Sequence, residues 1–200
     1  MLVAASGFAQ KNVVKANLFG MFAGSYTLAY ERVLNDKMSV QLSAGYRSYK
    51  YADITIGSIN EKDSYSGPTV VGEFRYYVTN GSKDVPRGFY VAPFARYAKY
   101  TEKWAYTDAS SPSSNYSQKW STTSIAGGVM LGYQWLIADV VSIDLFAGPQ
   151  YKTRSVSDIT ETDANGNTTT ISASNYTFSN TKGLTSGVGP RVGLNVGVAF

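Results

Sequence analysis

Apolar and polar residues alternate along most of this chain. At its C-terminal end, Val192, Leu194, Val196, Val198 and Phe200 fall on one face of an extended segment, while polar or small residues fall on the other. Successive side chains of a β-strand point to opposite faces, so this segment is predicted to be a strand with one apolar and one polar face. The same clear alternation returns at 37–49, 68–79, 121–137 and 140–153.

Eight such segments are expected in all, and no helical period of 3.6 residues emerges. Most are long enough to cross a bilayer at a tilt, which takes roughly 9–11 residues. The chain lacks the run of roughly 18–20 apolar residues that a membrane-spanning helix needs, so it would cross lipid only as a closed barrel. The expected strands are 12–20, 25–34, 37–49, 68–79, 88–100, 121–137, 140–153 and 187–200.

The connections between these segments differ in length on the two sides of the expected barrel. With the N-terminus placed in the periplasm, short periplasmic turns fall at 34–37, 80–87 and 137–139, and long outward loops at about 50–67, 101–120 and 154–186. The short apolar connection 20–24 is an exception. Segregated loop lengths are typical of outer-membrane barrels, whereas a soluble barrel has no reason to show them.

Aromatic residues follow the same topology and form two expected girdles. Such girdles mark the two membrane interfaces of transmembrane barrels. The prediction is therefore an all-β fold, an eight-stranded antiparallel up-and-down transmembrane β-barrel over 11–200, with periplasmic N- and C-termini and extracellular long loops. The periplasmic girdle comprises Tyr30, Tyr76, Phe89, Tyr133, Trp135 and Phe200, and the outer girdle comprises Tyr26, Tyr46, Tyr97 and Tyr151.

The composition excludes several classes of function but says less about the fold. Charged residues make up 16% of the chain, against roughly 25% in typical soluble proteins. The net charge of +4 is scattered and not clustered, which argues against nucleic-acid binding. The chain has no His and no Cys, which removes Ser-His and Cys-His catalysis, thiolate metal sites and disulfides. We expect a protein that is not an enzyme and uses no cofactor or metal.

The two ends of the chain carry features of export and barrel insertion. Residues 1–10 resemble the tail of a signal peptide, with small residues at Gly7 and Ala9, although no basic region precedes Lys11. At the other end, Val196, Val198 and Phe200 are predicted to form the barrel-closing C-terminal signal. Expected partners are accordingly the barrel-assembly machinery during insertion, outer-membrane lipids and lipopolysaccharide.

Charged side chains on the polar faces are expected to project into the lumen. An eight-stranded barrel is just wide enough to be filled by side chains, so these charges should pair in a salt-bridged plug around Glu31, Glu73 and Asp144. An alternative is a narrow ion path, in which five basic groups against three acidic ones would favour anions. General acid–base work by Glu31 or Glu73 is a third possibility. The predicted lumen set is Lys15, Glu31, Arg47, Glu73, Arg75, Arg96, Asp144 and Arg191.

The outward loops carry aromatic residues among Ser, Asn and Gly. Such residues suit a contact surface, but they would equally serve loops that fold on one another or rest in lipopolysaccharide. Within the last loop, Asp163-Ala-Asn-Gly-Asn167 predicts a hairpin tip in preference to a calcium loop. The loop aromatics singled out are Trp104, Tyr106, Tyr116, Trp120, Tyr176 and Phe178.

Taken over nearly its whole length, the chain resembles the small eight-stranded outer-membrane barrels of the OmpA/OmpX type. The segments Asn12-Val-Val-Lys-Ala-Asn-Leu18 and Tyr26-Thr-Leu-Ala-Tyr-Glu-Arg-Val33 are similar to an uncharacterised family of such barrels from Bacteroidota. That resemblance implies a fold and an outer-membrane location, but no activity.

Four roles compete for such a barrel. The leading hypothesis is a structural or surface-interaction role through the long loops. The second is an accessory subunit of a larger outer-membrane complex, packed through small lipid-facing residues such as Ala16, Ala44 and Gly72. The third is a narrow channel for ions or small solutes. The fourth, a soluble ligand-binding barrel such as a lipocalin, requires an apolar interior that the inward residues do not provide.

Overall fold

The computed structural model describes residues 11–78, 85–175 and 186–200. The expected signal-like segment 1–10 and the loop aromatics Tyr176 and Phe178 lie outside the described residues. The strands are β1 (Asn12–Asn17), β2 (Ser25–Asn35), β3 (Met38–Ile56), β4 (Ile59–Tyr77), β5 (Gly88–Asp108), β6 (Tyr116–Ile137), β7 (Val141–Val156), β8 (Ile159–Asp163), β9 (Thr168–Ile171) and β10 (Gly187–Ala199). The helices are α1 (Leu18–Phe22) and the short 3-10 turns η1 (Pro112–Ser114) and η2 (Ala173–Asn175).

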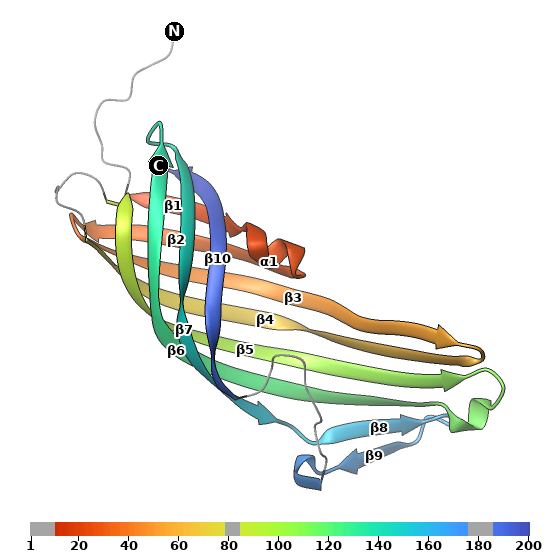
Figure 1. Ribbon diagram of the computed structural model, residues 1–200. Coiled ribbons are helices and arrows are strands. Elements are labelled where there is room, and N and C mark those ends of the chain that lie inside the picture. The colour runs from red at the N-terminus through yellow and green to blue at the C-terminus, as the bar shows by residue number, and fades with distance from the viewer. Residues whose placement is uncertain (1–10, 79–84, 176–185) are drawn as a thin grey trace.

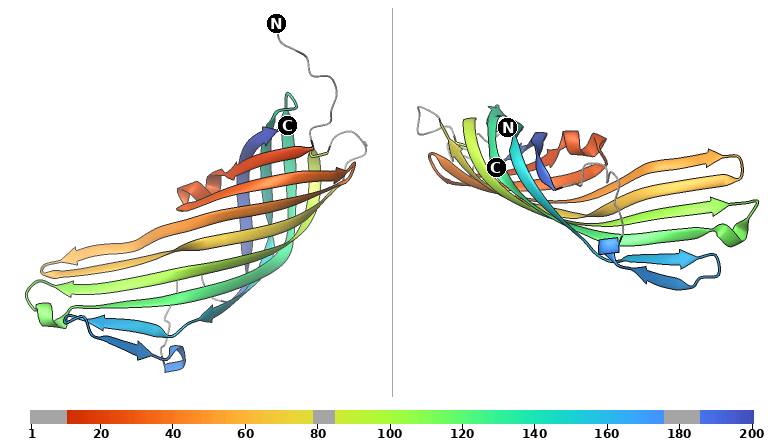
Figure 2. Two further views of the ribbon diagram at one scale, coloured as in Figure 1. Left: turned by 180° about the vertical axis from the view of Figure 1, so that it is seen from behind. Right: turned by 60° about the horizontal axis from the view of Figure 1, so that its bottom comes forward.

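Eight of these strands close into an antiparallel ring (Figures 1 and 2). Each of β1 to β6 pairs with the next strand, and β10 pairs with both β7 and β1. The backbone N–H of Asn12 donates to the carbonyl of Phe200, so the first and last strands meet at the closure. The predicted all-β antiparallel barrel is confirmed, with β8 and β9 as two strands beyond the expected eight.

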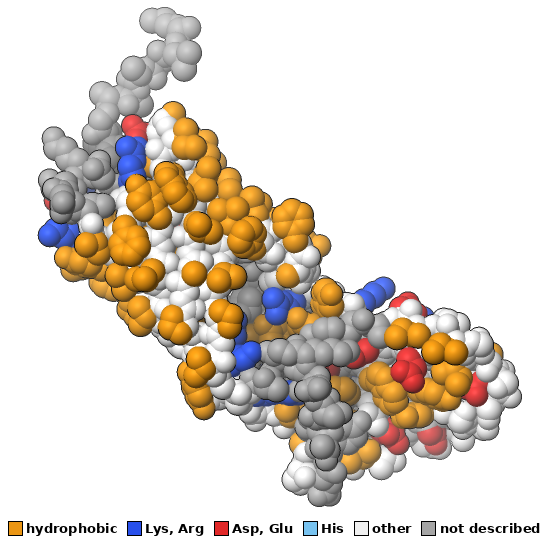
Figure 3. Space-filling model, viewed as in Figure 1, with side chains coloured by type: hydrophobic (Ala, Val, Ile, Leu, Met, Phe, Trp, Pro, Cys, Tyr) orange, Lys and Arg blue, Asp and Glu red, His pale blue; other side chains and the backbone are white. Residues whose placement is uncertain are grey.

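Side chains alternate around the ring as the sequence predicts. On β3, Val40 and Leu42 are exposed on the outside, while Ser39 and Gln41 are buried inside. Space-filling Figure 3 shows hydrophobic side chains spread over the outer wall of the barrel. The ten residues predicted for the two aromatic girdles are all exposed. A closed barrel with an apolar outside and a polar inside satisfies its backbone groups in lipid.

The strands β3 to β6 run well past the ring and form a flat extension at one end of the barrel (Figure 1). They are 19, 19, 21 and 22 residues long. Asn12, where β1 begins, and Phe200 lie at the opposite end of the barrel (Figure 1). The prediction of loops at 50–67 and 101–120 was therefore wrong, since only the turns between Ile56 and Ile59 and between Asp108 and Tyr116 lie outside the strands. Twelve of the 38 residues in these two segments are Thr, Tyr, Trp or Ile, which favour strands whether or not lipid surrounds them.

The predicted hairpin at Asp163–Asn167 is present as the turn between β8 and β9. This hairpin extends the sheet from β6, because β8 pairs with Tyr116–Lys119. Gly166 adopts a φ of 84°, a left-handed conformation that glycine accepts without strain. The Asp163 carboxylate accepts hydrogen bonds from the backbone and side chain of Asn167, and these bonds lower the pKa of Asp163. The carboxylate thus organises its own turn.

The expected first strand, 12–20, is shorter than predicted. It ends at Asn17, whose side-chain oxygen accepts a hydrogen bond from the Gly20 backbone N–H and begins helix α1. An Asn side chain at this position satisfies a backbone donor that the helix cannot, and this explains why the strand stops there. The helix leaves Phe19, Met21 and Phe22 exposed. Within the described residues, no helix is both long and apolar enough to span a membrane.

Candidate functional site in the barrel lumen

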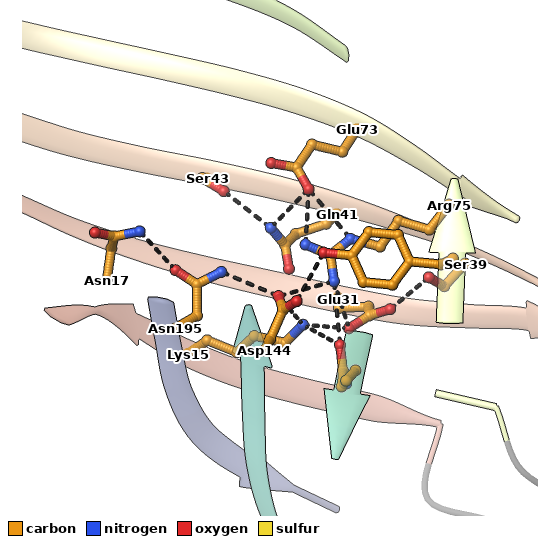
Figure 4. Close-up of polar contacts among 12 residues, drawn as sticks. Lys15, Asn17, Glu31, Ser39, Gln41, Ser43, Glu73, Arg75, Asp144 and Asn195 are labelled. Atoms are coloured by element: carbon orange, nitrogen blue, oxygen red, sulfur yellow. Dashed lines mark hydrogen bonds and ion pairs between the residues drawn. The ribbon is translucent and has the colours of Figure 1, made fainter. Parts of the chain in front are cut away.

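All eight ring strands contribute polar or aromatic side chains to the interior of the barrel. Alternation places every second residue of each strand inside, so residues distant in sequence meet at one level. Figure 4 shows Lys15 of β1, Glu31 of β2, Arg75 of β4 and Asp144 of β7 pointing toward one another. All four side chains are fully shielded from solvent. We call the charged residues joined at this level, defined below, the lumen network.

The Lys15 side chain links its own strand, β1, to three others, β2, β6 and β7. Its ammonium nitrogen lies 2.6 Å from a Glu31 oxygen, 3.2 Å from an Asp144 oxygen and 2.7 Å from the Gln134 amide oxygen. An ammonium group has three protons to donate, so all three are used. Two carboxylates and one amide oxygen thus stabilise an ammonium group that solvent does not reach.

Arg75 is the second central cation, and it bridges the two sides of the lumen. Its Nη2 lies 2.7 Å and its Nε 3.1 Å from one Glu73 oxygen, while Nη1 lies 3.0 Å from Asp144 and 3.6 Å from Glu31. The guanidinium also lies 4.5 Å from the ring centre of Tyr90. Its planar fork presents five N–H donors in fixed directions, whereas an ammonium group has three donors on a single nitrogen.

The carboxylates of the network are also bound by neutral donors. The hydroxyls of Tyr77 and Ser39 donate to Glu31 at 2.7 and 2.5 Å. The Tyr90 hydroxyl donates to Asp144 at 2.7 Å, and the amide of Asn195 donates to the same carboxylate at 3.1 Å. Carboxylates bound by cations and several donors are held in the charged form. The arrangement favours structural ion pairs over proton transfer.

Arg191 of β10 is the last member of the lumen network, which it joins through Glu73. Its Nη2 lies 2.8 Å from the second oxygen of Glu73, so Glu73 links Arg75 to Arg191. The Arg191 guanidinium also lies over the rings of Phe94 and Phe146, at 4.4 and 5.2 Å. The network thus comprises three cations, Lys15, Arg75 and Arg191, and three carboxylates, Glu31, Glu73 and Asp144.

Two of the eight predicted lumen charges stand apart from the network. Arg47 and Arg96 make no ion pair or hydrogen bond with any part of the chain that the structure describes, although Arg47 lies 5.9 Å from the Tyr65 ring. Both line a cavity of about 300 Å³, and Arg191 also reaches it. The structure therefore brings six of the predicted residues together and leaves two beside a cavity.

Several neutral members of the network were not singled out from the sequence. Tyr77, Tyr90 and Gln134 are buried and bind its charged groups. Their inward positions on β4, β5 and β6 follow from the alternation. Charge alone does not mark these residues, because they are the neutral hydroxyl and amide partners that buried charges require.

The four predicted loop aromatics that fall within the described residues lie on strands and not in loops. Trp104 and Tyr106 of β5 pack on Tyr116 of β6, with ring centres 5.1 and 5.6 Å apart. Trp120 is half-buried, and so are these three residues. For Trp104, Tyr106 and Tyr116, packing between neighbouring strands covers part of each ring, and their role in a contact surface stays a prediction.

The residues of the proposed closing signal lie on the last ring strand. Val196 and Val198 pair with Ala16 and Val14 of β1, and Phe200 follows at the end where the termini meet. Val198 and Phe200 are exposed on the outer wall. Their role in insertion stays a prediction.

Comparisons with solved structures identify the fold. A major outer membrane protein from Thermus thermophilus has 16% sequence identity and a TM-score of 0.53, over 95% of this chain and 98% of that chain. CarO of Acinetobacter baumannii has 12% identity and a TM-score of 0.46, over 96% of each chain. Ail, the attachment invasion locus protein of Yersinia pestis, has 12% identity and a TM-score of 0.41, over 94% of this chain and 95% of that chain.

The fold, an antiparallel β-barrel, is shared with the Thermus outer-membrane protein. No curated protein matches the chain. The expected Bacteroidota affiliation stays a prediction. A family sequence profile described as "Protein of unknown function (DUF3575)" matches residues 1–185. The chain therefore belongs to the DUF3575 family.

Proposed function

We propose that this protein is an integral barrel of the bacterial outer membrane that is not an enzyme and acts by contact at the cell surface. The apolar outer wall and the two aromatic girdles support insertion in lipid. The terminal end of the barrel would face the periplasm, and the extension would stand outside the cell among lipopolysaccharide. Helix α1 would lie at the outward-facing interface between the membrane and water, with its exposed side chains Phe19, Met21 and Phe22 in that interface.

The observation that carries the proposal is the bare edge of β3 in the extension. The pairing of β2 with β3 ends at Ser25 and Arg47, and the Ser48 N–H still donates to Gly24. Beyond that point, residues 49–56 pair with β4 on one side and have no partner strand on the other within the described residues. At about 3.3 Å per residue, this edge is about 26 Å long.

An edge of this kind is a template for another chain. Unpaired backbone N–H and C=O groups accept an added strand, and the side chains on either face give specificity. Ile54 and Ile56 beside this edge are 52% and 73% exposed. We infer that the partner is a protein that adds an extended segment to β3.

The lumen network supports a role that does not depend on conduction. Lys15 and Arg75 are fully buried at its centre, and Tyr77, Tyr90 and Met130 fill the same part of the barrel with side chains that are also fully buried. A pore needs a continuous polar path, and the packed residues interrupt it at this level. We therefore expect a closed lumen, with no conductance in a planar bilayer.

The test shortens the β3–β4 hairpin without disturbing the ring. Tyr49 and Tyr65 are direct partners, so replacing residues 50–64 with Asn-Gly gives a two-residue hairpin in the same register. The matched control replaces residues 160–170 with Asn-Gly between the partners Ile159 and Ile171, which removes most of β8 and β9. Both variants and the unaltered chain are cross-linked in cells and purified from outer membranes.

We expect a stoichiometric protein partner with the unaltered chain and with the 160–170 variant, and its loss with the 50–64 variant. A larger membrane complex recovered in this pattern would make the protein an accessory subunit docked through β3. The same partners with all three proteins, or a lone barrel in every case, would overturn the proposal.

A further inference from the structure

Positive and negative charges do not balance in the part of the lumen between the lumen network and the extension. Within the network, three cations face three carboxylates, so it is neutral as a unit. Arg47 and Arg96 add two positive charges, and neither meets a carboxylate among the described residues. Nearby, the carboxylate of Glu102 is already engaged by Arg154 and by the hydroxyl of Thr122.

Both unpaired arginines border the same cavity. Its volume is about 300 Å³, well above the roughly 10–15 Å³ that a single water molecule requires. The lining extends from Glu73 of the network to Ser25 and Arg47, the last β2–β3 pair before the extension. The cavity therefore lies at the extended end of the lumen, where Figure 3 shows Lys and Arg side chains around a hollow.

The arginines of the cavity gather despite their mutual repulsion. Arg191 and Arg47 both lie close enough to Arg96 to repel it. The Nε of Arg96 and the Nη1 of Arg191 are buried without a partner among the described residues. Like charges brought together in a partly enclosed space need a counter-charge, because the unfavourable Coulomb energy rises as water is excluded.

The rest of the lining fits a small anion with oxygen acceptors. Thr27, Ser43 and Asn195 offer hydroxyl or amide donors, while Val71 and Phe146 give an apolar floor. The planar guanidinium group matches the geometry of phosphate oxygens and can bind two of them at once. Two unpaired arginines correspond to the charge of a phosphate dianion.

We propose that this cavity is a binding site for a phosphate group, with Arg47 and Arg96 as its principal ligands and Arg191 as a third contact. The group is either free inorganic phosphate or the phosphate of a small ester that enters from the extended end. The site uses no part of the bare β3 edge, so it stands or falls independently of the surface-contact role.

The test titrates inorganic phosphate into the purified full chain in detergent micelles, by isothermal calorimetry at constant ionic strength in sodium chloride. We expect saturable binding at one site per chain. Arg96→Gln and Arg47→Gln should each weaken it about tenfold or more, because each removes a charge-assisted contact. The matched control is Lys99→Gln, which removes a positive charge from the outward face of β5, three residues from Arg96.

Glycerol phosphate, titrated in the same way, distinguishes an ester from the free ion by its relative affinity. Each variant is first checked for folding by testing whether it resists unfolding in a denaturing detergent that has not been heated. If Arg96→Gln does not fold, Arg47→Gln and the unaltered chain decide the question. An absence of saturable phosphate binding, equal losses with Lys99→Gln, or equally tight binding of chloride would overturn the proposal.

Discussion

Replacing Arg75 with methionine tests whether the lumen network holds the barrel together. Methionine fills much of the same volume, so the main loss is the positive charge and its hydrogen bonds. Those bonds reach Glu73 at 2.7 and 3.1 Å, Asp144 at 3.0 Å and Gln134 at 3.1 Å, in a fully buried setting. Removing one partner of a buried ion pair costs about 3–5 kcal/mol, since the opposite charge stays buried without compensation.

The loss of stability in Arg75→Met should fall within that range and should be smaller than the summed free energies of the four separate hydrogen bonds. Lys15 still binds Asp144, and Arg191 still binds Glu73, so neither carboxylate is left without a cation. A second variant, Arg75→Met with Asp144→Asn, restores the balance of two cations and two carboxylates. It should be at least about 1 kcal/mol more stable than Arg75→Met alone, because residues in one network do not act additively.

The assay is urea unfolding of the refolded protein in lipid vesicles, followed by fluorescence of its three tryptophans. The matched control is Arg32→Met, which removes an exposed arginine from strand β2 of the same barrel and should change the free energy of unfolding by less than about 1 kcal/mol. If Arg75→Met costs no more than this control, or the double variant is the less stable of the two, the network does not stabilise the barrel as described.

Two further predictions concern local structure. Gly148→Ala should destabilise the barrel by about 1–3 kcal/mol, because a Cβ there would collide with the carbonyl oxygen of Val129. Gly72→Ala meets nothing within 4 Å and should change stability by less than about 0.5 kcal/mol, so equal effects in the urea assay would contradict this reasoning. The Asn167 side chain lowers the pKa of Asp163. Its stabilisation of the β8–β9 turn is therefore present above the unfolded pKa and lost as pH falls through the folded pKa. A drop in acid of the protection factor of the Asn167 amide, relative to its intrinsic exchange rate at each pH, would show this loss, and Asp163→Asn should not show the drop.

The barrel itself could be predicted from the sequence because a closed barrel with an apolar outer wall and a polar interior enforces a strict rule on its strands. Val40 and Leu42 outside and Ser39 and Gln41 inside follow from a period of two. The same period placed Lys15, Glu31 and Arg75 in the lumen. Pairing between these residues then followed from the cost of burying an unpaired charge.

The extension could not be predicted in the same way. Beyond the closed ring a strand has no lumen on one of its faces, so residues 50–67 and 101–120 lose the apolar–polar contrast and resemble loops. Helix α1 was missed because it depends on one local hydrogen bond, from the Gly20 N–H to Asn17. The separation of Arg47 and Arg96 from the network depends on which strands lie opposite one another, and alternation alone does not give that.

The central claim is that the extension stands outside the cell while the opposite end faces the periplasm. The chain has no cysteine, so single substitutions report cleanly on each end. Ile56→Cys lies at the tip of the β3–β4 hairpin, and Asp36→Cys lies in the turn between β2 and β3. A membrane-impermeant maleimide added to intact cells should label Ile56→Cys at once and Asp36→Cys only after the outer membrane is opened. Labelling of both positions in intact cells, or of Asp36→Cys alone, would contradict the account.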